Sequence, residues 1–200
     1  MEKSVAIIGT RGYPSYYGGF ETLVRRLAPY LADNGWTVSV YGRQGAIKLE
    51  DPTIDHRIES VLTRGLESKS LSTLSFGLTS SIHAARKKPD VALIMNVANG
   101  FFLPALKARR IPTVVNVDGI EWERDKWGKR AKQAFKAGAT ITARLADDLV
   151  YDSREIARRW NEEYRRTGHF IPYGGTEIDN TLPVPEGLAS KEYALMVARF

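Results

Sequence analysis

The chain has no cysteine, and its three histidines, His56, His83 and His169, lie far apart in the sequence. Without cysteine there is no disulfide, no thiol nucleophile and no thiolate-bound metal, and the histidine spacing matches no metal-ligand pattern. No run of about 18 apolar residues is present, and no basic segment leads into an apolar one at the N-terminus. We therefore expect no metal, no transmembrane helix and no signal peptide, and we expect a cytoplasmic protein.

The charge is unbalanced, because 29 Lys and Arg residues stand against 23 Asp and Glu residues, with a net charge of +6 and a pI near 9.5. A basic protein is attracted to nucleic acid, phosphorylated substrates or an acidic membrane surface. The basic residues gather on two expected helices, as a solvated face or as a membrane-facing patch. These residues are Lys129, Arg130, Lys132 and Lys136 on the first helix, and Arg154, Arg158, Arg159, Arg165 and Arg166 on or after the second.

Strand and helix signals alternate along the chain, which predicts a doubly wound, Rossmann-like α/β fold with a mainly parallel sheet. Short apolar runs predict strands near 4–9 and at 36–41, 91–96, 112–117, 148–151 and 169–172, and an alternating pattern predicts an edge strand near 54–60. Helical spacing predicts helices at 19–34, 71–87, 100–110, 128–146 and 153–165. With 43% hydrophobic residues, the chain can form one well-cored domain.

The composition changes after residue 178. Residues 179–192 hold two prolines, a glycine and polar residues with little apolar periodicity, as a linker does. Residues 193–200 then resemble a new buried strand, which needs partner strands to be stable. We therefore expect an N-terminal domain at 1–178, an interdomain linker at 179–192, and at 193–200 the first strand of a second domain in a longer protein.

A glycine-rich loop joins the first strand to the first helix. The loop contains Gly9, Arg11 and Gly12, and the pair Gly18 and Gly19 stands at the start of the helix. Backbone N–H groups and the helix dipole favour an anion at a helix N-terminus. The loop therefore either holds a phosphate or a sugar, or forms a tight turn without a ligand.

The loop lacks the dinucleotide-binding fingerprint, which needs the glycine pattern G-x-G-x-x-G and an acidic residue at the end of the second strand. Here the second strand ends at Arg43. An arginine at this point could meet the 2′-phosphate of NADP, so an NADP-dependent oxidoreductase is one alternative. A basic nucleic-acid-binding module, suggested by the pI alone, is another.

Polar and aromatic residues follow the strand at 112–117, where open parallel sheets place ligands. They offer faces for stacking and charges for phosphate or hydroxyl groups. A surface loop with helix-capping acids is the alternative. The residues concerned are Asp118, Gly119, Trp122, Arg124 and Trp127.

Two further loops are expected at the same edge of the sheet. Asn96 and Asn99 come at the end of one strand, and Tyr173 and Gly174 follow the last one. The asparagines either cap a turn or contact a ligand. The glycine segment either acts as a hinge or belongs to the site.

Three motifs occur together in the order GTRGYPSYYGGFETLVRRLAPYLADNGWTVSVYGR, NVDGIEWERDKW and IPYGGTEI. With them, residues 3–200 resemble the N-terminal domain of family 4 retaining glycosyltransferases of GT-B fold. Within that family the resemblance is to the bacterial rhamnosyltransferases that build cell-surface polysaccharides. It implies two Rossmann-like domains facing each other across a cleft, with the acceptor mainly on the N-terminal domain and the nucleotide-sugar mainly on the C-terminal one.

The resemblance also implies roles for individual residues. Gly18 and Gly19 match the glycine pair beside the donor diphosphate and the acceptor. Glu21 matches the acid at the start of the following helix, and Arg11 lies in the same loop. Asp118 stands where many members have a histidine near the transferred sugar, and it is a candidate base, sugar ligand or loop anchor. The remaining expected substrate-binding residues are Asn99, Gly119, Tyr173 and Gly174, with Trp122, Arg124 and Trp127 for acceptor recognition.

The reaction that the resemblance implies is sugar transfer with retention, in which the nucleotide diphosphate leaves and the acceptor hydroxyl attacks from the same face. We expect rhamnose from dTDP-rhamnose as the sugar, with UDP-glucose, UDP-N-acetylglucosamine or another nucleotide-sugar as the alternative donor. We expect a lipid-linked saccharide as the acceptor, at an anionic membrane surface on the cytoplasmic side. We expect no metal and no nucleic-acid partner. The family's donor-binding residues belong to the second domain, so residues 1–200 alone are expected to be inactive.

Overall fold

The computed structural model describes residues 3–16, 18–43, 46–47, 50–66, 72–174, 184, 187 and 189. These residues form one seven-stranded sheet with the order β3-β2-β1-β4-β5-β6-β7, and all of its neighbouring strands are parallel. The predicted Rossmann-like α/β class is therefore confirmed. Almost all of the predicted linker at 179–192, and the whole predicted strand at 193–200, lie outside the described residues.

Most predicted elements agree with the structure to within two residues. The strands are β1 Lys3–Ile8, β2 Trp36–Arg43, β3 Glu59–Thr63, β4 Val91–Met95, β5 Thr113–Val117, β6 Asp148–Tyr151 and β7 His169–Phe170. The helices are α1 Gly19–Asp33, α2 Ser72–Lys87, α3 Leu103–Lys107, α4 Lys129–Leu145 and α5 Arg154–Tyr164, with the 3₁₀ helices η1 Val97–Phe102 and η2 Glu121–Glu123. None of the described helices is long and apolar enough to cross a membrane.

The strand predicted near 54–60 was placed too early, although its position at the sheet edge is confirmed. The strand begins at Glu59, because Asp55 turns the chain before it. The Asp55 carboxylate accepts a hydrogen bond of 3.0 Å from the backbone N–H of Arg57, and its carbonyl accepts one of 3.1 Å from Ile58. An aspartate that binds the backbone two residues on favours such a turn over an extended strand.

The helix predicted at 100–110 is instead η1 followed by the short α3. Asn96 has φ +71°, and its side chain accepts a hydrogen bond of 2.8 Å from the backbone N–H of Ala98. Asparagine is enriched at positive φ and at helix N-caps, so it starts η1 directly after β4. Gly100 of η1 lies against α4, since a Cβ at this position would come within 2.5 Å of the carbonyl oxygen of Gly138.

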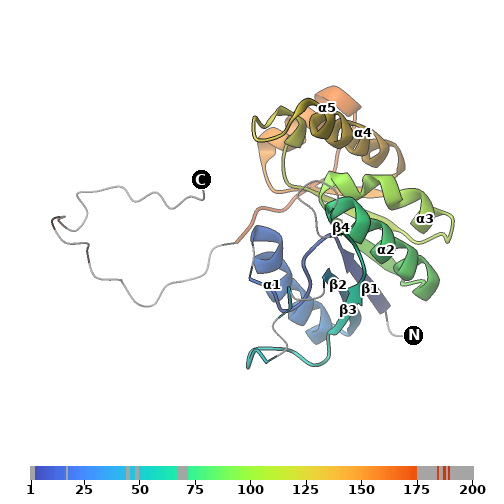
Figure 1. Ribbon diagram of the computed structural model, residues 1–200, viewed down its shortest axis with the longest axis vertical. Helices are drawn as coiled ribbons and strands as arrows, with labels where there is room; N and C mark the ends of the chain where they lie inside the picture. The colour runs from blue at the N-terminus through green and yellow to red at the C-terminus, as the bar shows by residue number, and fades with distance from the viewer. Residues whose placement is uncertain are drawn as a thin grey trace.

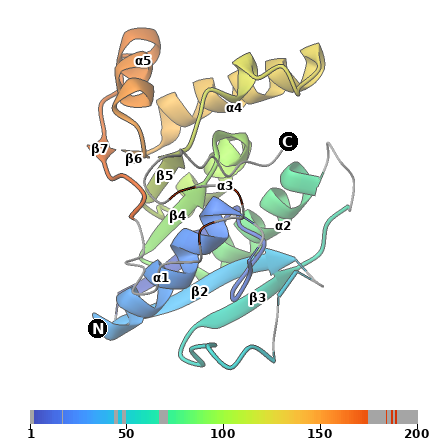
Figure 2. The ribbon, with the colours of Figure 1, turned by 90° about the vertical axis from the view of Figure 1, so that its left-hand side faces the viewer.

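Helices cover both faces of the sheet (Figure 1). On one face α1 buries Val24 and Ala28 against strands β1 and β2. On the other face α2, α3, α4 and α5 bury a larger apolar cluster, whose largest member is the fully buried Trp160 of α5. Figure 2 shows α1 in front of the sheet and α2 to α4 behind it. Because all strands are parallel, the loops that follow them leave the sheet at the same carboxyl edge.

Candidate active site

The direction of the strand order reverses between β1 and β4. The chain passes from β1 to β2 on one side, whereas β4 pairs with β1 on the other side and the sheet continues to β7. In open parallel sheets, the crevice outside the carboxyl ends of the strands at this reversal binds ligands. The loops that start after β1, β4 and β5 all leave the sheet at this edge, so most of the predicted site residues are brought to one place.

Gly9 and Asn99 pack against each other at this edge. Gly9 has φ +97°, and a Cβ there would lie only 2.3 Å from the carbonyl oxygen of Met95 and 2.6 Å from Nδ2 of Asn99. Asn99 is 1% exposed, and its amide donates a hydrogen bond of 2.7 Å to the same Met95 carbonyl. Asn99 therefore packs beneath the loop after β1, and its contact with substrate stays a prediction.

The start of α1 brings four predicted residues together. Glu21 is 5% exposed, and its Oε1 accepts a hydrogen bond of 3.0 Å from the backbone N–H of Arg11. Gly18 is the N-cap, where a Cβ would lie 3.3 Å from Oε2 of Glu21. At Gly19 no atom of the described chain lies within 4 Å of such a Cβ. No side chain of the described residues caps this helix N-terminus, which suits an anionic group of a ligand.

Asp118 follows β5 and is half-buried. Nδ2 of Asn96 donates a hydrogen bond of 3.4 Å to its Oδ1. Burial raises the pKa of Asp118 to about 6. The negative charges of Glu121 and Asp152 also raise this pKa, whereas Arg124 opposes them. A carboxyl group of this kind, placed at a sheet edge that binds ligands, is suited to hold or accept a proton near neutral pH.

Glu121 joins the side chains of the loop after β5, and the sequence analysis assigned it no role. It is 4% exposed, with Oε1 2.9 Å from Nε of Arg124 and Oε2 accepting a hydrogen bond of 2.7 Å from Nε1 of Trp127. Gly119 leaves room for this arrangement, because a Cβ there would lie 2.9 Å from Nη2 of Arg124. The sequence pattern that could have predicted this role is an acidic residue followed by an arginine three residues later and a tryptophan six residues later.

Trp122 lies in an aromatic cluster. Its ring centre is 6.5 Å from that of Trp160 and 6.4 Å from that of Tyr164, and Nζ of Lys136 lies 4.9 Å above it. Such tilted and edge-on ring pairs stabilise packing. The half-buried indole therefore connects η2 to α4 and α5, and its role in acceptor recognition stays a prediction.

The segment after β7 brings Tyr173 to the same edge. Burial raises the pKa of Tyr173, and the negative charges of three carboxylates raise it further. These carboxylates belong to Asp118, Asp152 and Glu21. Gly174 has no atom of the described chain within 4 Å of a Cβ built on it.

Asp152 is a second site residue that the sequence analysis missed. It follows β6 directly, its Oδ1 is buried without a hydrogen-bond partner in the described chain, and burial raises the pKa of this carboxyl. The signal was an acidic residue at the carboxyl end of a strand of a parallel sheet, where ligands bind.

Arg43, the residue considered for NADP binding, contacts the protein's own groups. Its Nη1 donates a hydrogen bond of 2.5 Å to Oγ of Ser72, and its guanidinium lies 4.9 Å from the ring centre of Phe76. These contacts hold the side chain against α2 and do not favour a 2′-phosphate site. Among the described residues, no group of three His, Cys, Asp or Glu side chains could hold a metal ion.

A parallel sheet with a glycine-rich loop at its switch point defines a Rossmann-like domain. The sequence model of Glycosyltransferase Family 4 matches residues 17–174, more than half of the chain. The chain therefore belongs to glycosyltransferase family 4, as the motifs predicted. The family favours a transferase over the NADP-dependent oxidoreductase and the nucleic-acid-binding module. A comparison with curated proteins gave no match.

Solved structures of other proteins share this fold. Sucrose-phosphate synthase from Thermosynechococcus elongatus has a TM-score of 0.60 and 16% identity, over 86% of this chain and 48% of that chain. Another structure of this synthase has a TM-score of 0.57 and 16% identity, over 86% of this chain and 90% of that chain. LpCGTa in complex with UDP has a TM-score of 0.54 and 13% identity, over 90% of this chain and 55% of that chain. Because these sequence identities are low, the similarity shows the fold alone. The chain spans about half the length of the first synthase structure and of LpCGTa.

Proposed function

We propose that the protein is part of a retaining glycosyltransferase that moves a sugar from a nucleotide-sugar to a lipid-linked saccharide. The observation that carries the proposal is the position of Asp118 directly after β5, at the carboxyl edge of the sheet. Its carboxyl is half-buried, its pKa is raised to about 6, and Nδ2 of Asn96 lies 3.4 Å from it. Membership of family 4 supports the reaction class.

In the proposed reaction, the bond between the anomeric carbon and the diphosphate breaks while a bond to the acceptor oxygen forms on the same face. The N-terminus of α1 at Gly19 offers backbone N–H groups to the charge that develops on the diphosphate. Asp118 accepts a hydrogen bond from the acceptor hydroxyl and orients it for attack. The hydroxyl proton passes to the departing diphosphate, so no covalent intermediate with the protein is needed.

The proposed donor is dTDP-rhamnose, supported by the resemblance of the three motifs to rhamnosyltransferases. A nucleotide-sugar agrees with the family, and LpCGTa was solved with UDP. Arg124 and Trp127, which Glu121 holds in place, are proposed to contact the acceptor, because they combine a cation and an aromatic face in the loop that follows Asp118. We propose that no metal takes part.

A membrane-facing surface is proposed at the start of α4. Lys129 and Arg130 are exposed there. Beside them a cavity of about 240 Å³ has mostly apolar walls. Its apolar lining includes Leu74, Phe101, Trp127, Ala131, Ala134 and Phe135. Cations around an apolar surface favour an anionic membrane, so we propose that the protein binds at the cytoplasmic face and that the lipid part of the acceptor approaches here.

Two of the other basic residues considered for the membrane, Arg158 and Lys136, are paired within the protein. Arg158 forms ion pairs with Glu155 at 2.6 Å and Glu162 at 2.5 Å. Lys136 contacts Glu163 and the ring of Trp122. These pairs favour a solvated surface for α5 and for this part of α4, so the proposed membrane contact is restricted to the first turn of α4.

The experiment that tests the proposed function incubates the full-length protein with a panel of nucleotide-sugars and a short lipid-linked saccharide. Mass spectrometry then shows whether the acceptor gains a sugar. A gain of one deoxyhexose from dTDP-rhamnose alone supports the whole proposal, and a gain from another donor supports the class but corrects the sugar. An arm with EDTA tests the absence of a metal, since a loss of transfer there would contradict it. No gain from any donor would contradict the proposed function.

A further inference from the structure

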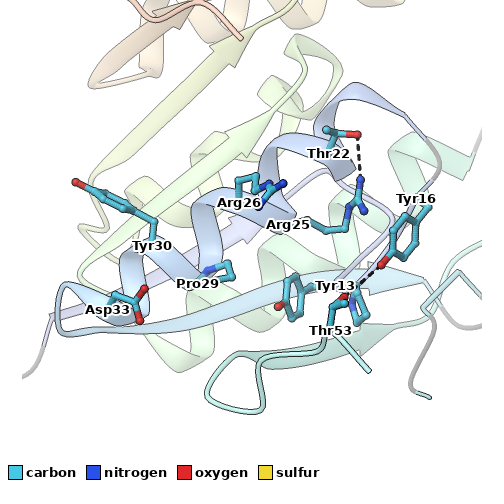
Figure 3. A pocket seen from close by; sticks show the side chains of 10 residues that line it. Tyr13, Tyr16, Thr22, Arg25, Arg26, Pro29, Tyr30, Asp33 and Thr53 are labelled. Atoms are coloured by element: carbon cyan, nitrogen blue, oxygen red, sulfur yellow. Dashed lines mark hydrogen bonds between the residues drawn. The ribbon is translucent and has the colours of Figure 1, made fainter. Parts of the chain in front are cut away.

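A second hollow runs along one side of α1 (Figure 3). Its volume is about 540 Å³. One stripe of α1, with residues three and four positions apart, forms one wall, and Tyr13, Pro14, Tyr16 and Thr53 complete the lining. The stripe consists of Thr22, Arg25, Arg26, Pro29, Tyr30 and Asp33. At about 1.5 Å per residue this wall is roughly 17 Å long, which makes it a groove for an extended ligand.

Two arginines supply positive charge to this α1 groove. The guanidinium of Arg25 lies 3.9 Å from the ring centre of Tyr16, and its Nη2 is 3.5 Å from Oγ1 of Thr22. Its Nε has no hydrogen-bond partner in the described chain. Arg26 is exposed and forms no ion pair with a described residue. Arg25 is therefore held in position by stacking, and both cations can bind an anion.

Acidic groups lie near other parts of the groove. Asp33, at the far end, forms an ion pair of 2.7 Å with Arg57. The hydroxyl of Tyr16 donates a hydrogen bond of 2.5 Å to Asp51. The hydrogen bond leaves the charge of Asp51 in place, and Arg57 is shared with Asp55 at 2.6 Å, so the positive charge of the groove is confined to Arg25 and Arg26. Arginine binds carboxylates with two parallel hydrogen bonds, so it is well suited to a carboxylate-bearing ligand.

Aromatic rings and hydroxyl groups line the rest of the groove. Tyr30 is 61% exposed and Tyr16 is 44% exposed. The hydroxyls of Thr22 and Thr53 also line the hollow. A tyrosine has an apolar face and a polar end, which complement the C–H face and the hydroxyl groups of a sugar ring. Aromatic faces, hydroxyls and arginines together match an acidic saccharide better than a free anion.

We propose that the α1 groove binds a saccharide that carries carboxylate groups. Its carboxylates pair with Arg25 and Arg26, and its rings stack on Tyr30. The groove begins at Thr22, in the first turn of α1, close to the helix N-terminus at Gly19. The groove therefore holds a distal part of the acceptor glycan while the reacting end lies at the carboxyl edge, and this last assignment rests on the proposed function.

Isothermal titration calorimetry of the full-length protein, without any nucleotide-sugar, tests the proposal. The probes are a tetragalacturonate and a hyaluronan tetrasaccharide, with methyl-esterified tetragalacturonate as the uncharged control. We expect at least one acidic probe to bind and the ester to bind much more weakly. Arg26→Gln, an exposed change, is expected to weaken binding about tenfold, as the loss of a charged hydrogen bond does. The matched Arg86→Gln, at the exposed end of α2, is expected to change nothing.

Two variants of Tyr30 test the stacking. Tyr30→Phe keeps the ring and is expected to bind like the wild type, whereas Tyr30→Ala is expected to bind several-fold more weakly. Inorganic phosphate is titrated as a further arm. Binding of phosphate that depends on Arg26 but not on Tyr30 would overturn the saccharide in favour of a simple anion site. Failure of both acidic probes to bind, equal binding of the ester, or an equal effect of Arg86→Gln would also overturn the proposal. None of these results affects the transfer assay, so the two proposals fail separately.

Discussion

Nε1 of Trp127 donates a hydrogen bond of 2.7 Å to Oε2 of the buried Glu121. This bond ties a wall of the apolar cavity beside α4 to the loop that carries Asp118. The charge of Glu121 also contributes to the raised pKa of Asp118. One carboxylate therefore affects both the proposed acceptor surface and the proton affinity of the candidate catalytic group.

Replacement of Glu121 is expected to lower the stability and the apparent affinity for the acceptor. Glu121→Ala removes the partner of Trp127 and of Arg124, so the free energy of unfolding is expected to fall by about 1–3 kcal/mol. Glu121→Gln keeps an acceptor for the indole and is expected to have a smaller effect. Urea unfolding and the KM for the acceptor measure both effects. If the two variants matched the wild type, Glu121 would not organise the loop.

The raised pKa of Asp118 predicts a pH dependence of transfer. Since the proposed role needs the carboxylate, the rate is expected to fall as the pH drops through about 6. A pH–rate profile of the full-length protein measures this. A rate that stayed constant from pH 7.5 to about 5 would contradict the role.

The same shift affects folding stability. The folded pKa of about 6 lies above the ordinary value of 3.8, so the folded state binds the proton more tightly than the unfolded state. Proton binding therefore stabilises the folded state fully below the unfolded pKa of 3.8, and this stabilisation is lost as the pH rises through about 6. Asp118→Asn is expected to be more stable than the wild type at pH 7, by roughly 1–2 kcal/mol after allowance for solvent screening. Denaturant unfolding of both proteins over a pH series checks the sign.

Substitutions at the glycine pair separate ligand binding from folding. A methyl group at Gly19 meets no atom of the described chain, so Gly19→Ala is expected to fold at least as well as the wild type. It is nevertheless expected to reduce kcat/KM, because the methyl group narrows the proposed anion site. At Gly18 the added Cβ approaches Glu21 at 3.3 Å, so Gly18→Ala is expected to lower Tm as well. Full activity of Gly19→Ala would place the substrate elsewhere.

The proposed membrane contact predicts an effect of charge reversal at the start of α4. Flotation with anionic liposomes is expected to recover the wild-type protein and to lose Lys129→Glu/Arg130→Glu. The control Arg86→Glu/Lys87→Glu changes the net charge equally at the last turn of α2 and is expected to float like the wild type. Equal loss in both double variants would indicate only a general dependence on net charge.

The fold was predictable because it follows from local patterns. Apolar runs and helical spacing placed β1, α1 and α4 to within one residue. The errors arose where a side chain overrides the pattern: Asp55 binds the backbone of Arg57 and delays β3, and Asn96 takes a positive φ and starts η1. Both are polar side chains that bind nearby backbone groups, which hydrophobic periodicity does not detect.

The site was predictable only in part. The sheet topology explains why Gly19 and Asp118, distant in sequence, reach the same edge. Periodicity gave no indication that Glu121 is buried between Arg124 and Trp127, because that burial depends on how the loop folds over the edge. The α1 groove was also missed, since it is formed by a helix face together with loops from elsewhere in the chain.

The most direct test of the central claim compares sugar transfer by the full-length wild type and Asp118→Asn, with dTDP-rhamnose and a lipid-linked saccharide at pH 7.5. The wild type is expected to add one deoxyhexose, and the variant, still folded by circular dichroism, is expected to be slower by about 100-fold or more. Asp125→Asn, a change in an exposed residue of the same loop, is expected to match the wild type. Transfer by Asp118→Asn at the wild-type rate would contradict the proposed site.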